Sequence, residues 1–249
     1  IQEHADYFSG AWERERPVMH GIVAALGKFC LRRADAARAV SERVRDHLVR
    51  SCKVAPDRIT VIPVSQDLSK LFAREPRPWP PYVKTSGDRP STPTIVVPCR
   101  FVKQKGLDVL VAALARLKDE GVAFKARLVG AGPLRRKIAA EIERLGLAEA
   151  VTIEPWSSQE QLWKDADLFV LSSNYEGWGR TVVEAMVARV PIVTTDVGCV
   201  GSFMRSQVDG RVVQPGDVRG LAAAIREQLS EPERREWMVR TAYERAKEF

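Results

Sequence analysis

The chain has 249 residues, 45% of them hydrophobic and 29% charged, which is typical of one large or two modest globular domains. Its formal net charge of +7 suits phosphate-bearing partners or an anionic membrane surface. We expect no nucleic-acid partner, because there is no zinc spacing, RNP-like aromatic motif or basic arm, and no spanning segment, because no apolar run approaches about 18 residues.

The first 75 residues predict helices alternating with strands. Apolar positions recur at helical spacing between residues 11 and 33, and a short strand follows at 37–40. Ser41 with Glu42 indicates a helix start, and the β-branched run at 58–64 is typical of a buried strand. Six prolines between residues 73 and 93 indicate a linker, which we place at 76–92.

Beyond the linker, apolar strands alternate regularly with helices. We predict strands at 94–99, 124–130, 150–154, 168–172 and 191–195, with helices between them at 106–120, 133–145, 159–164 and 181–189. This alternation implies an α/β, Rossmann-like parallel sheet with helices on both faces. The last segment predicts a charged helix with a thin apolar stripe at Trp237, Met238, Ala242 and Ala246.

The cysteines and the first residue bear on cellular context. Cys30, Cys52, Cys99 and Cys199 show no ligand spacing, which favours reduced thiols in the cytoplasm, and we expect Cys99 and Cys199 to be buried at strand ends. The histidines are far apart, so we expect no metal site. The chain begins at Ile1, in a stretch that resembles the middle of a domain, and we therefore expect a fragment of a longer protein.

Ligands of open parallel sheets bind at the carboxyl ends of the strands, so the residues that follow each strand are candidates for a site. Arg100 could fork onto two phosphate oxygens, and Lys105 would add a point charge. Backbone amides that glycines leave accessible, beside a helix N-terminus, would complete a diphosphate site. Solvated loop cations are an equally good interpretation of Arg100 and Lys105 from spacing alone.

The segment GAGPLRR at 130–136 resembles the start of a dinucleotide-binding motif. Glu154 lies 22 residues beyond Gly132, near the place of a ribose-binding carboxylate. Arg135 occupies the third glycine position, however, and Pro133 suits the first turn of a helix. A plain strand-to-helix turn therefore explains this segment about as well.

Two glutamates, Glu176 and Glu184, stand eight positions apart around a turn that contains two glycines. Both follow a predicted strand end and are therefore candidates for the site. The alternatives are that Thr181 and Glu184 form a capping box, and that Glu176 is an exposed loop carboxylate. Trp178 between the glycines is either a pocket wall or a packing residue.

These segments together resemble the donor-binding half of retaining glycosyltransferases of family 4 (group 1), which have the GT-B fold. The likeness covers about residues 28–249 through CRFVKQKGLDVL, LVGAGPLRRKI, NYEGWGRTVVEAM, IVTTDVG and VDGRVVQPGDVRGLAAAI. It implies a donor-binding domain at 93–229, a crossover helix at 230–249 and, at 1–75, the C-terminal remnant of an acceptor-binding domain. The rest of that N-terminal domain is expected to be missing.

The resemblance also implies roles for single residues. Glu176 corresponds to the carboxylate that faces the donor sugar, and Arg100 and Lys105 to diphosphate-binding cations; these three are our catalytic candidates. Glu184 corresponds to the carboxylate that binds the ribose of the nucleotide. The donor-binding candidates are Glu184, Gly177, Trp178, Gly179, Arg180, Thr181, Gly130, Gly132 and Glu154. Whether His4 is the active-site histidine of the acceptor domain stays open.

The sequence departs from the family pattern at several positions. Cys99 and Arg189 each stand where the family has a glycine, and Cys199 stands in place of one glycine of a pair. Ser202 replaces a glutamate, and Val64-Ser65 replaces an asparagine-glycine. These departures leave the phosphate and ribose contacts intact but put the sugar-hydroxyl contacts near 198–202 in doubt.

The resemblance implies a retaining hexosyltransferase that moves a sugar from a UDP- or GDP-linked donor to a glycan or lipid-linked acceptor, with no other cofactor and no metal. Such enzymes commonly build polysaccharides and glycolipids, so we expect a cytoplasmic protein with peripheral association at the inner face of the membrane. One alternative is a donor-binding module that is inactive alone because its acceptor domain is incomplete. Another is a glycosidase using Glu176 and Glu184, which leaves Arg100 and Lys105 without a role.

Overall fold

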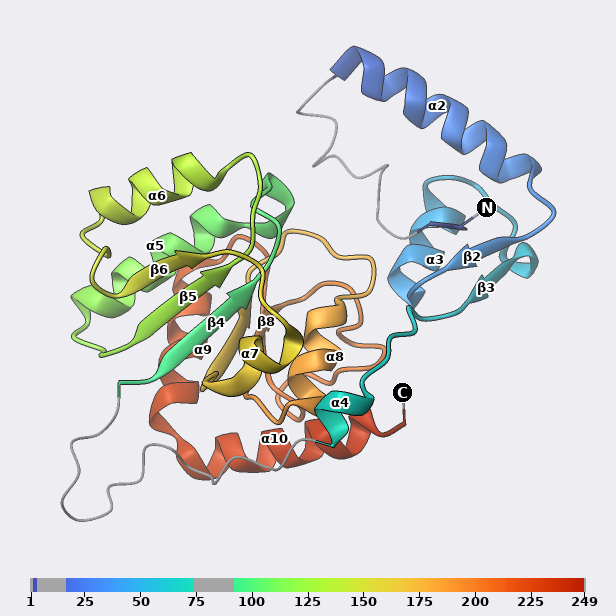
Figure 1. Cartoon of the computed structure of the whole chain (residues 1–249). Helices are drawn as coiled ribbons and strands as arrows, with labels where there is room; N and C mark the ends of the chain where they lie inside the picture. The colour runs from blue at the N-terminus through green and yellow to red at the C-terminus, as the bar shows by residue number, and fades with distance from the viewer. Residues whose placement is uncertain (1, 4–16, 74–91, 249) are drawn as a thin grey trace.

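The computed structural model describes residues 2–3, 17–73 and 92–248 (Figure 1). A three-stranded parallel sheet belongs to the first 73 residues, and a six-stranded parallel sheet belongs to residues 92–248. The Rossmann-like fold class predicted from the sequence is therefore confirmed. Most of the predicted linker at 76–92 lies outside the described residues, so the domain boundaries stay a prediction.

The smaller sheet has the strand order β1-β2-β3. Ser41 begins the helix after β2 as predicted, because its hydroxyl accepts a hydrogen bond from the Val44 amide at 3.3 Å. Among the described apolar side chains of the first helix, Leu26 is 59% and Phe29 55% exposed, whereas Leu31 is buried. The elements of this part are β1 (Gln2–Glu3), α2 (Pro17–Arg33), β2 (Ala37–Ala39), α3 (Glu42–Arg50), the 3-10 helix η1 (Pro56–Arg58), β3 (Ile59–Val61) and α4 (Ser69–Phe72).

The larger sheet has the order β6-β5-β4-β7-β8-β9, and every pair of neighbours is parallel. Its strands are β4 (Thr94–Pro98), β5 (Lys125–Val129), β6 (Val151–Glu154), β7 (Leu168–Leu171), β8 (Ile192–Thr195) and β9 (Arg211–Val213). Its helices are η2 (Lys103–Lys105), α5 (Leu107–Asp119), α6 (Arg135–Arg144), α7 (Gln159–Lys164), α8 (Arg180–Val187), α9 (Val218–Ser230) and α10 (Pro232–Ala246). The sequence had not predicted β9 or α9 as elements.

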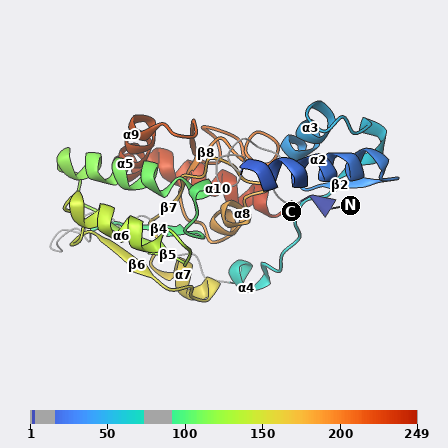
Figure 2. The same ribbon diagram turned by 90° about the horizontal axis from the view of Figure 1, so that it is seen from above.

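The sheet reverses its direction of growth between β4 and β7. The chain runs outward from β4 through β5 to β6, returns to pair β7 with the other edge of β4, and continues to β8 and β9. Helices α5, α6 and α9 pack on one face against Ile95 and Val97, while α7 and α8 cover the opposite face, where Val96 lies. Figure 2 shows α5 and α9 on one side of the strands and α7 on the other. A crevice at such a switch point is where open α/β sheets bind ligands.

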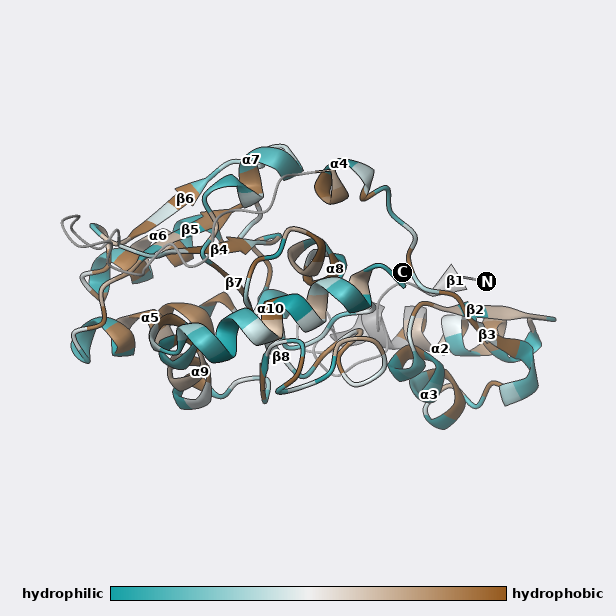
Figure 3. Ribbon diagram, turned by 90° about the horizontal axis from the view of Figure 1, so that it is seen from below, coloured by the Kyte–Doolittle hydropathy of each residue, from teal (hydrophilic) through white to brown (hydrophobic). Residues whose placement is uncertain are grey.

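The last helix, α10, crosses back toward α4 and packs on α8. Met238, Ala242 and Ala246 are buried as predicted, but the prediction for Trp237 is wrong, since this side chain is 42% exposed. Spacing of four residues keeps the other three on one face, and Trp237 points away from it. The outer side of α10 is mostly hydrophilic (Figure 3). Arg235 is buried instead, and its guanidinium donates to the Gln228 carbonyl at 2.6 Å.

An arginine replaces the usual glycine at the end of α8. Arg189 has φ 55°, a left-handed conformation that costs a side-chain-bearing residue free energy. Its guanidinium lies 4.0 Å from the ring centroid of Tyr243 in α10, a cation–π contact. The same ring lies 6.0 Å from the ring of Phe72 in α4. Arg189 therefore links the end of α8 to α10, and Tyr243 of α10 in turn contacts α4.

Candidate functional site

A cavity of about 750 Å³ lies at the carboxyl ends of β4, β6 and β7, beside the switch point. Its walls come from the end of β4 and the loop after it, the β6–α7 loop with α7, the β7–α8 turn with α8, and one residue of the segment before α4. The lining residues are Val64, Pro98, Cys99, Arg100, Lys105, Trp156, Ser157, Gln159, Leu162, Glu176, Gly177, Trp178, Gly179, Arg180, Thr181 and Glu184.

The cavity brings together the predicted residues from two segments that are distant in sequence. Arg100 and Lys105 after β4 meet all the predicted residues of the β7–α8 turn, from Glu176 to Glu184. The sequence prediction missed Trp156, Ser157 and the other residues after β6. The same strand-end rule could have found them, because β6 ends beside β5 at this edge of the sheet.

Glu154 does not line the cavity. Its carboxylate accepts bonds from Arg127, with Nε 3.0 Å from Oε1 and Nη2 2.9 Å from Oε2, and another from Thr152 at 3.1 Å. The Arg127 guanidinium lowers the pKa of this carboxyl. Pairing of β5 with β6 sets Arg127 directly beside Thr152, so the Glu154 carboxylate already has its hydrogen-bond partners on the sheet. The geometry therefore does not support a ribose-binding role for Glu154.

Gly130 and Gly132 also lie outside the cavity, but they shape it. A Cβ on Gly130 would lie 2.0 Å from the Cys99 carbonyl oxygen, and one on Gly132 would lie 2.6 Å from that of Phe101. The Phe101 amide donates to the Ala131 carbonyl at 2.8 Å. These glycines therefore let the loop after β5 lie directly against the loop that carries Arg100, which is a packing role.

The Glu176 carboxylate is fixed by two neighbours. Lys105 Nζ lies 2.5 Å from Oε1, and Ser173 Oγ donates to the same oxygen at 2.6 Å. The Lys105 and Glu176 side chains are only 18% and 11% exposed, so neither is a solvated loop charge. Arg100 is exposed on the rim, and its guanidinium has no ion pair within the part of the chain that the structure describes.

The β7–α8 turn depends on two glycines with left-handed backbone. Gly179 is the N-cap of α8 with φ 88°, and Gly198, with φ 60°, approaches the turn so closely that a Cβ would lie 2.4 Å from the Trp178 carbonyl oxygen. That carbonyl accepts from the Cys199 amide at 2.7 Å. The loop after β8 thus supports the turn that carries Glu176 and Trp178, and larger residues at these glycines would displace it.

Glu184 lies inside α8 rather than at its cap. The capping-box interpretation is wrong, because the N-cap is Gly179 and no side chain caps this helix. Glu184 is buried and lines the cavity. Burial raises the pKa of its carboxyl, although the charge of Arg180 and hydrogen bonds from Gln159 and Trp163 act in the opposite direction. A desolvated carboxylate facing a cavity is a strong acceptor for ligand hydroxyls.

The thiol beside Arg100 is expected to be inert. Burial raises the pKa of Cys99 and of Cys199 to about 12, so at pH 8 only about one in 10⁴ of these thiols would be ionised. We expect iodoacetamide at pH 8 to label the exposed Cys30 in the folded protein and to spare Cys99 and Cys199. Mass spectrometry checks this, with unfolded protein as the control. Labelling of Cys99 as fast as Cys30 would contradict it.

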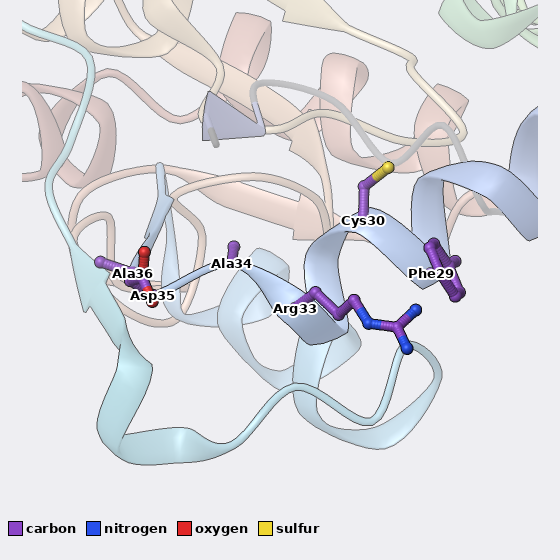
Figure 4. Close-up of a pocket in the computed structure, with 6 residues that line it drawn as sticks. All are labelled: Phe29, Cys30, Arg33, Ala34, Asp35 and Ala36. Atoms are coloured by element: carbon purple, nitrogen blue, oxygen red, sulfur yellow. The ribbon is translucent and has the colours of Figure 1, made fainter.

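A smaller hollow at the end of α2 is lined by Phe29, Cys30, Arg33, Ala34, Asp35 and Ala36 (Figure 4). It offers one cation and one carboxylate, and the Arg33 guanidinium already lies 4.0 Å from the Phe29 ring centroid. His4 lies outside the described residues. Within the described ranges, no cluster of side chains could hold a metal ion, and no helix is long and apolar enough to cross a bilayer.

Comparison with known families gives two matches. The family described as "Glycosyl transferases group 1" matches residues 83–245, and "Glycosyltransferase Family 4" matches residues 1–70. Alpha-D-kanosaminyltransferase of Streptomyces kanamyceticus is 28% identical over 219 residues, which cover 86% of this chain and 56% of the relative. The putative colanic acid biosynthesis glycosyltransferase WcaL of Escherichia coli is 32% identical over 146 residues, 55% of this chain and 36% of the relative. The chain thus spans about half the length of the curated relatives it matches.

Solved structures share the fold. Sucrose-phosphate synthase from Thermosynechococcus elongatus superimposes with a TM-score of 0.80 at 24% identity, over 99% of this chain and 62% of that chain. HepE of Anabaena in complex with UDP-glucose gives 0.77 at 21% identity, over 99% of this chain and 66% of that chain. Both similarities extend across the smaller and the larger sheet.

Proposed function

This chain belongs to the group 1 glycosyl transferases, and on that premise we propose that its cavity binds a nucleotide-diphosphate sugar whose glycosyl group passes to a glycan or lipid-linked acceptor. The observation that carries the proposal is the convergence, in one cavity at the switch point, of Arg100, Lys105, Glu176 and Glu184. Cations suit the diphosphate, and the two carboxylates suit the hydroxyls of the two sugars. HepE, a relative in fold, is known in complex with UDP-glucose.

Each part of the donor has a matching group in this cavity. Arg100 is exposed and has no ion pair among the described residues, so it can bind the diphosphate through two nitrogens without breaking a described ion pair. Lys105, the last residue of η2, lines the cavity and is paired with Glu176, so it can contact the diphosphate while it neutralises the carboxylate. Gly177, Trp178 and Gly179 line the same cavity at the start of α8, where their backbone amides could contact the diphosphate. Glu184 would accept bonds from the ribose, and Trp156, 52% exposed at the rim, offers a flat ring to the base.

The proposed transfer breaks the bond between the anomeric carbon and the diphosphate oxygen. The electron pair stays on the diphosphate, the acceptor oxygen bonds to the anomeric carbon, and the acceptor proton leaves with the nucleoside diphosphate. Arg100, Lys105 and the turn amides would stabilise the charge that develops on the leaving group. Glu176 would favour a cationic sugar ring. Retention of configuration and a hexose as the donor sugar belong to this proposal through the family resemblance.

Binding and transfer are separate questions for this chain. A module that holds the donor but lacks a complete acceptor domain would show nucleotide-sugar binding without turnover. A glycosidase would use the two carboxylates without the cations, yet Lys105 is bonded to one of those carboxylates. We therefore retain donor binding as the first property to measure and favour transfer over hydrolysis.

Calorimetric titration with UDP- and GDP-linked sugars tests the proposal, and Arg100→Ala sharpens the test. We expect one nucleotide class to bind, and the variant to bind it roughly ten- to 150-fold more weakly, because hydrogen bonds to charged groups contribute about 1.5–3 kcal/mol. The melting temperature should not change, since Arg100 is exposed and has no ion pair within the ranges that the structure describes. Arg219→Ala, an exposed arginine at the start of α9, is the matched control. The absence of binding by both classes, or equal binding by Arg100→Ala, would contradict the proposal.

A further inference from the structure

A second cavity, of about 620 Å³, lies on the other side of Trp178 from the candidate donor cavity. The segment between β3 and α4 lines it with Ser65 and Leu68, and α4 lines it with Phe72. Phe203 from the loop after β8 lines it together with Trp178. Trp178 is the residue that both cavities share. Trp178 therefore forms part of the wall of both cavities.

The two cavities are also joined at their edges. Val64 lines the donor cavity, and the next residue, Ser65, lines the second one. Gln66 of the second cavity accepts a hydrogen bond at Oε1 from Arg180 Nε of the donor cavity, at 2.9 Å. A ligand in the second cavity would therefore lie next to a donor, separated from it by one aromatic ring and one hydrogen-bonded pair.

The chemistry of the second cavity differs from that of the donor cavity. Among the described residues that line it there is no lysine or arginine, whereas three cations line the donor cavity. A phosphate would find no counter-charge there. The rings of Trp178 and Phe203 lie 5.9 Å apart at 39°, and Phe72 and Leu68 add further apolar surface. Hydroxyls of Ser65 and Ser69 and the carboxylate of Glu248 supply polar groups.

This combination matches a neutral sugar. A pyranose ring presents an apolar C–H face, which packs on aromatic rings, and a rim of hydroxyls, which bond to hydroxyl and carboxylate groups. The absence of cations among the described lining residues disfavours a nucleotide or a phosphorylated sugar at the same place. We propose that the second cavity binds a neutral pyranose unit of the acceptor, with its ring against Trp178 and Phe203. This inference rests on the proposed function and names a substrate class for it.

Saturation-transfer NMR with methyl glycosides of glucose, galactose, mannose and N-acetylglucosamine tests the inference on the whole chain. We expect at least one glycoside to bind the wild type. Phe203→Leu keeps an apolar side chain but removes the ring, and should weaken binding roughly two- to tenfold. Ser65→Leu places bulk at an exposed position in the cavity and should abolish the signal. Ser230→Leu, at an exposed serine of α9, should bind as the wild type does.

Titration of each variant with the nucleotide sugar separates this inference from the proposed function. Unchanged donor affinity together with weaker glycoside binding supports the second cavity. If no glycoside binds the wild type, or if Phe203→Leu and Ser65→Leu both bind as tightly as the wild type does, the inference is overturned while donor binding stands. Loss of donor binding by the wild type itself would instead overturn the proposed function.

Discussion

Replacing Lys105 by methionine is expected to lower the free energy of unfolding by about 3 kcal/mol, because it leaves the Glu176 carboxylate buried without its cation. The bond from Ser173 remains and keeps the cost at the lower end of the usual range. Donor affinity should also fall roughly ten- to 150-fold, since the same ammonium is proposed to contact the diphosphate. Urea unfolding and calorimetry measure the two effects.

A second substitution distinguishes the two roles of Lys105. Adding Glu176→Gln to Lys105→Met removes the unpaired charge, so most of the lost stability should return. Donor affinity and turnover should stay low, because neither charge is present in the cavity. Lys125→Met, at an exposed lysine of β5, is the control and should change neither property. A Lys105→Met variant as stable as the wild type would show that the ion pair does not hold Glu176.

The sequence predicted best those strands and site residues whose local pattern agrees with their place in the tertiary structure. Strands β4 to β8 were predicted within one residue at each end, since each is a short apolar run bounded by turn residues. The strand-end rule then located Arg100, Lys105 and the β7–α8 turn at one edge of the sheet. β9 escaped prediction because it has only three residues, all of them partly exposed.

Side-chain partners could not be predicted from spacing. Glu154 stands at the expected distance from Gly132, yet strand pairing gives it Arg127 as its partner. Thr181 and Glu184 fit a capping box by spacing, but the helix begins at Arg180, and its N-cap is Gly179, two residues before Thr181. The second cavity is also invisible in the sequence, because it combines residues near 65, 178 and 203. Register and helix start are set by packing across the fold rather than by neighbours in the chain.

Replacing Glu184 by glutamine is expected to weaken donor binding roughly ten- to 150-fold, through loss of charged hydrogen bonds to the ribose. The same change should raise the melting temperature at neutral pH. The carboxylate is buried, and burial raises its pKa, so its ionised form is penalised in the folded protein. An amide of the same shape carries no such penalty. Opposite changes in affinity and stability are not expected of a residue that only supports the helix.

The pH dependence of that stability difference gives an independent check on Glu184. Because the pKa of Glu184 is raised in the folded state, its contribution to the stability of the fold is fully present below the ordinary pKa of a glutamate. That contribution is lost as pH rises through the folded-state pKa. The stability advantage of Glu184→Gln should therefore grow as pH is raised from about 4 to about 8. Glu160→Gln, at an exposed glutamate of α7, should show neither this trend nor a loss of affinity. Full donor affinity in Glu184→Gln would mean that the ribose is held elsewhere in the cavity.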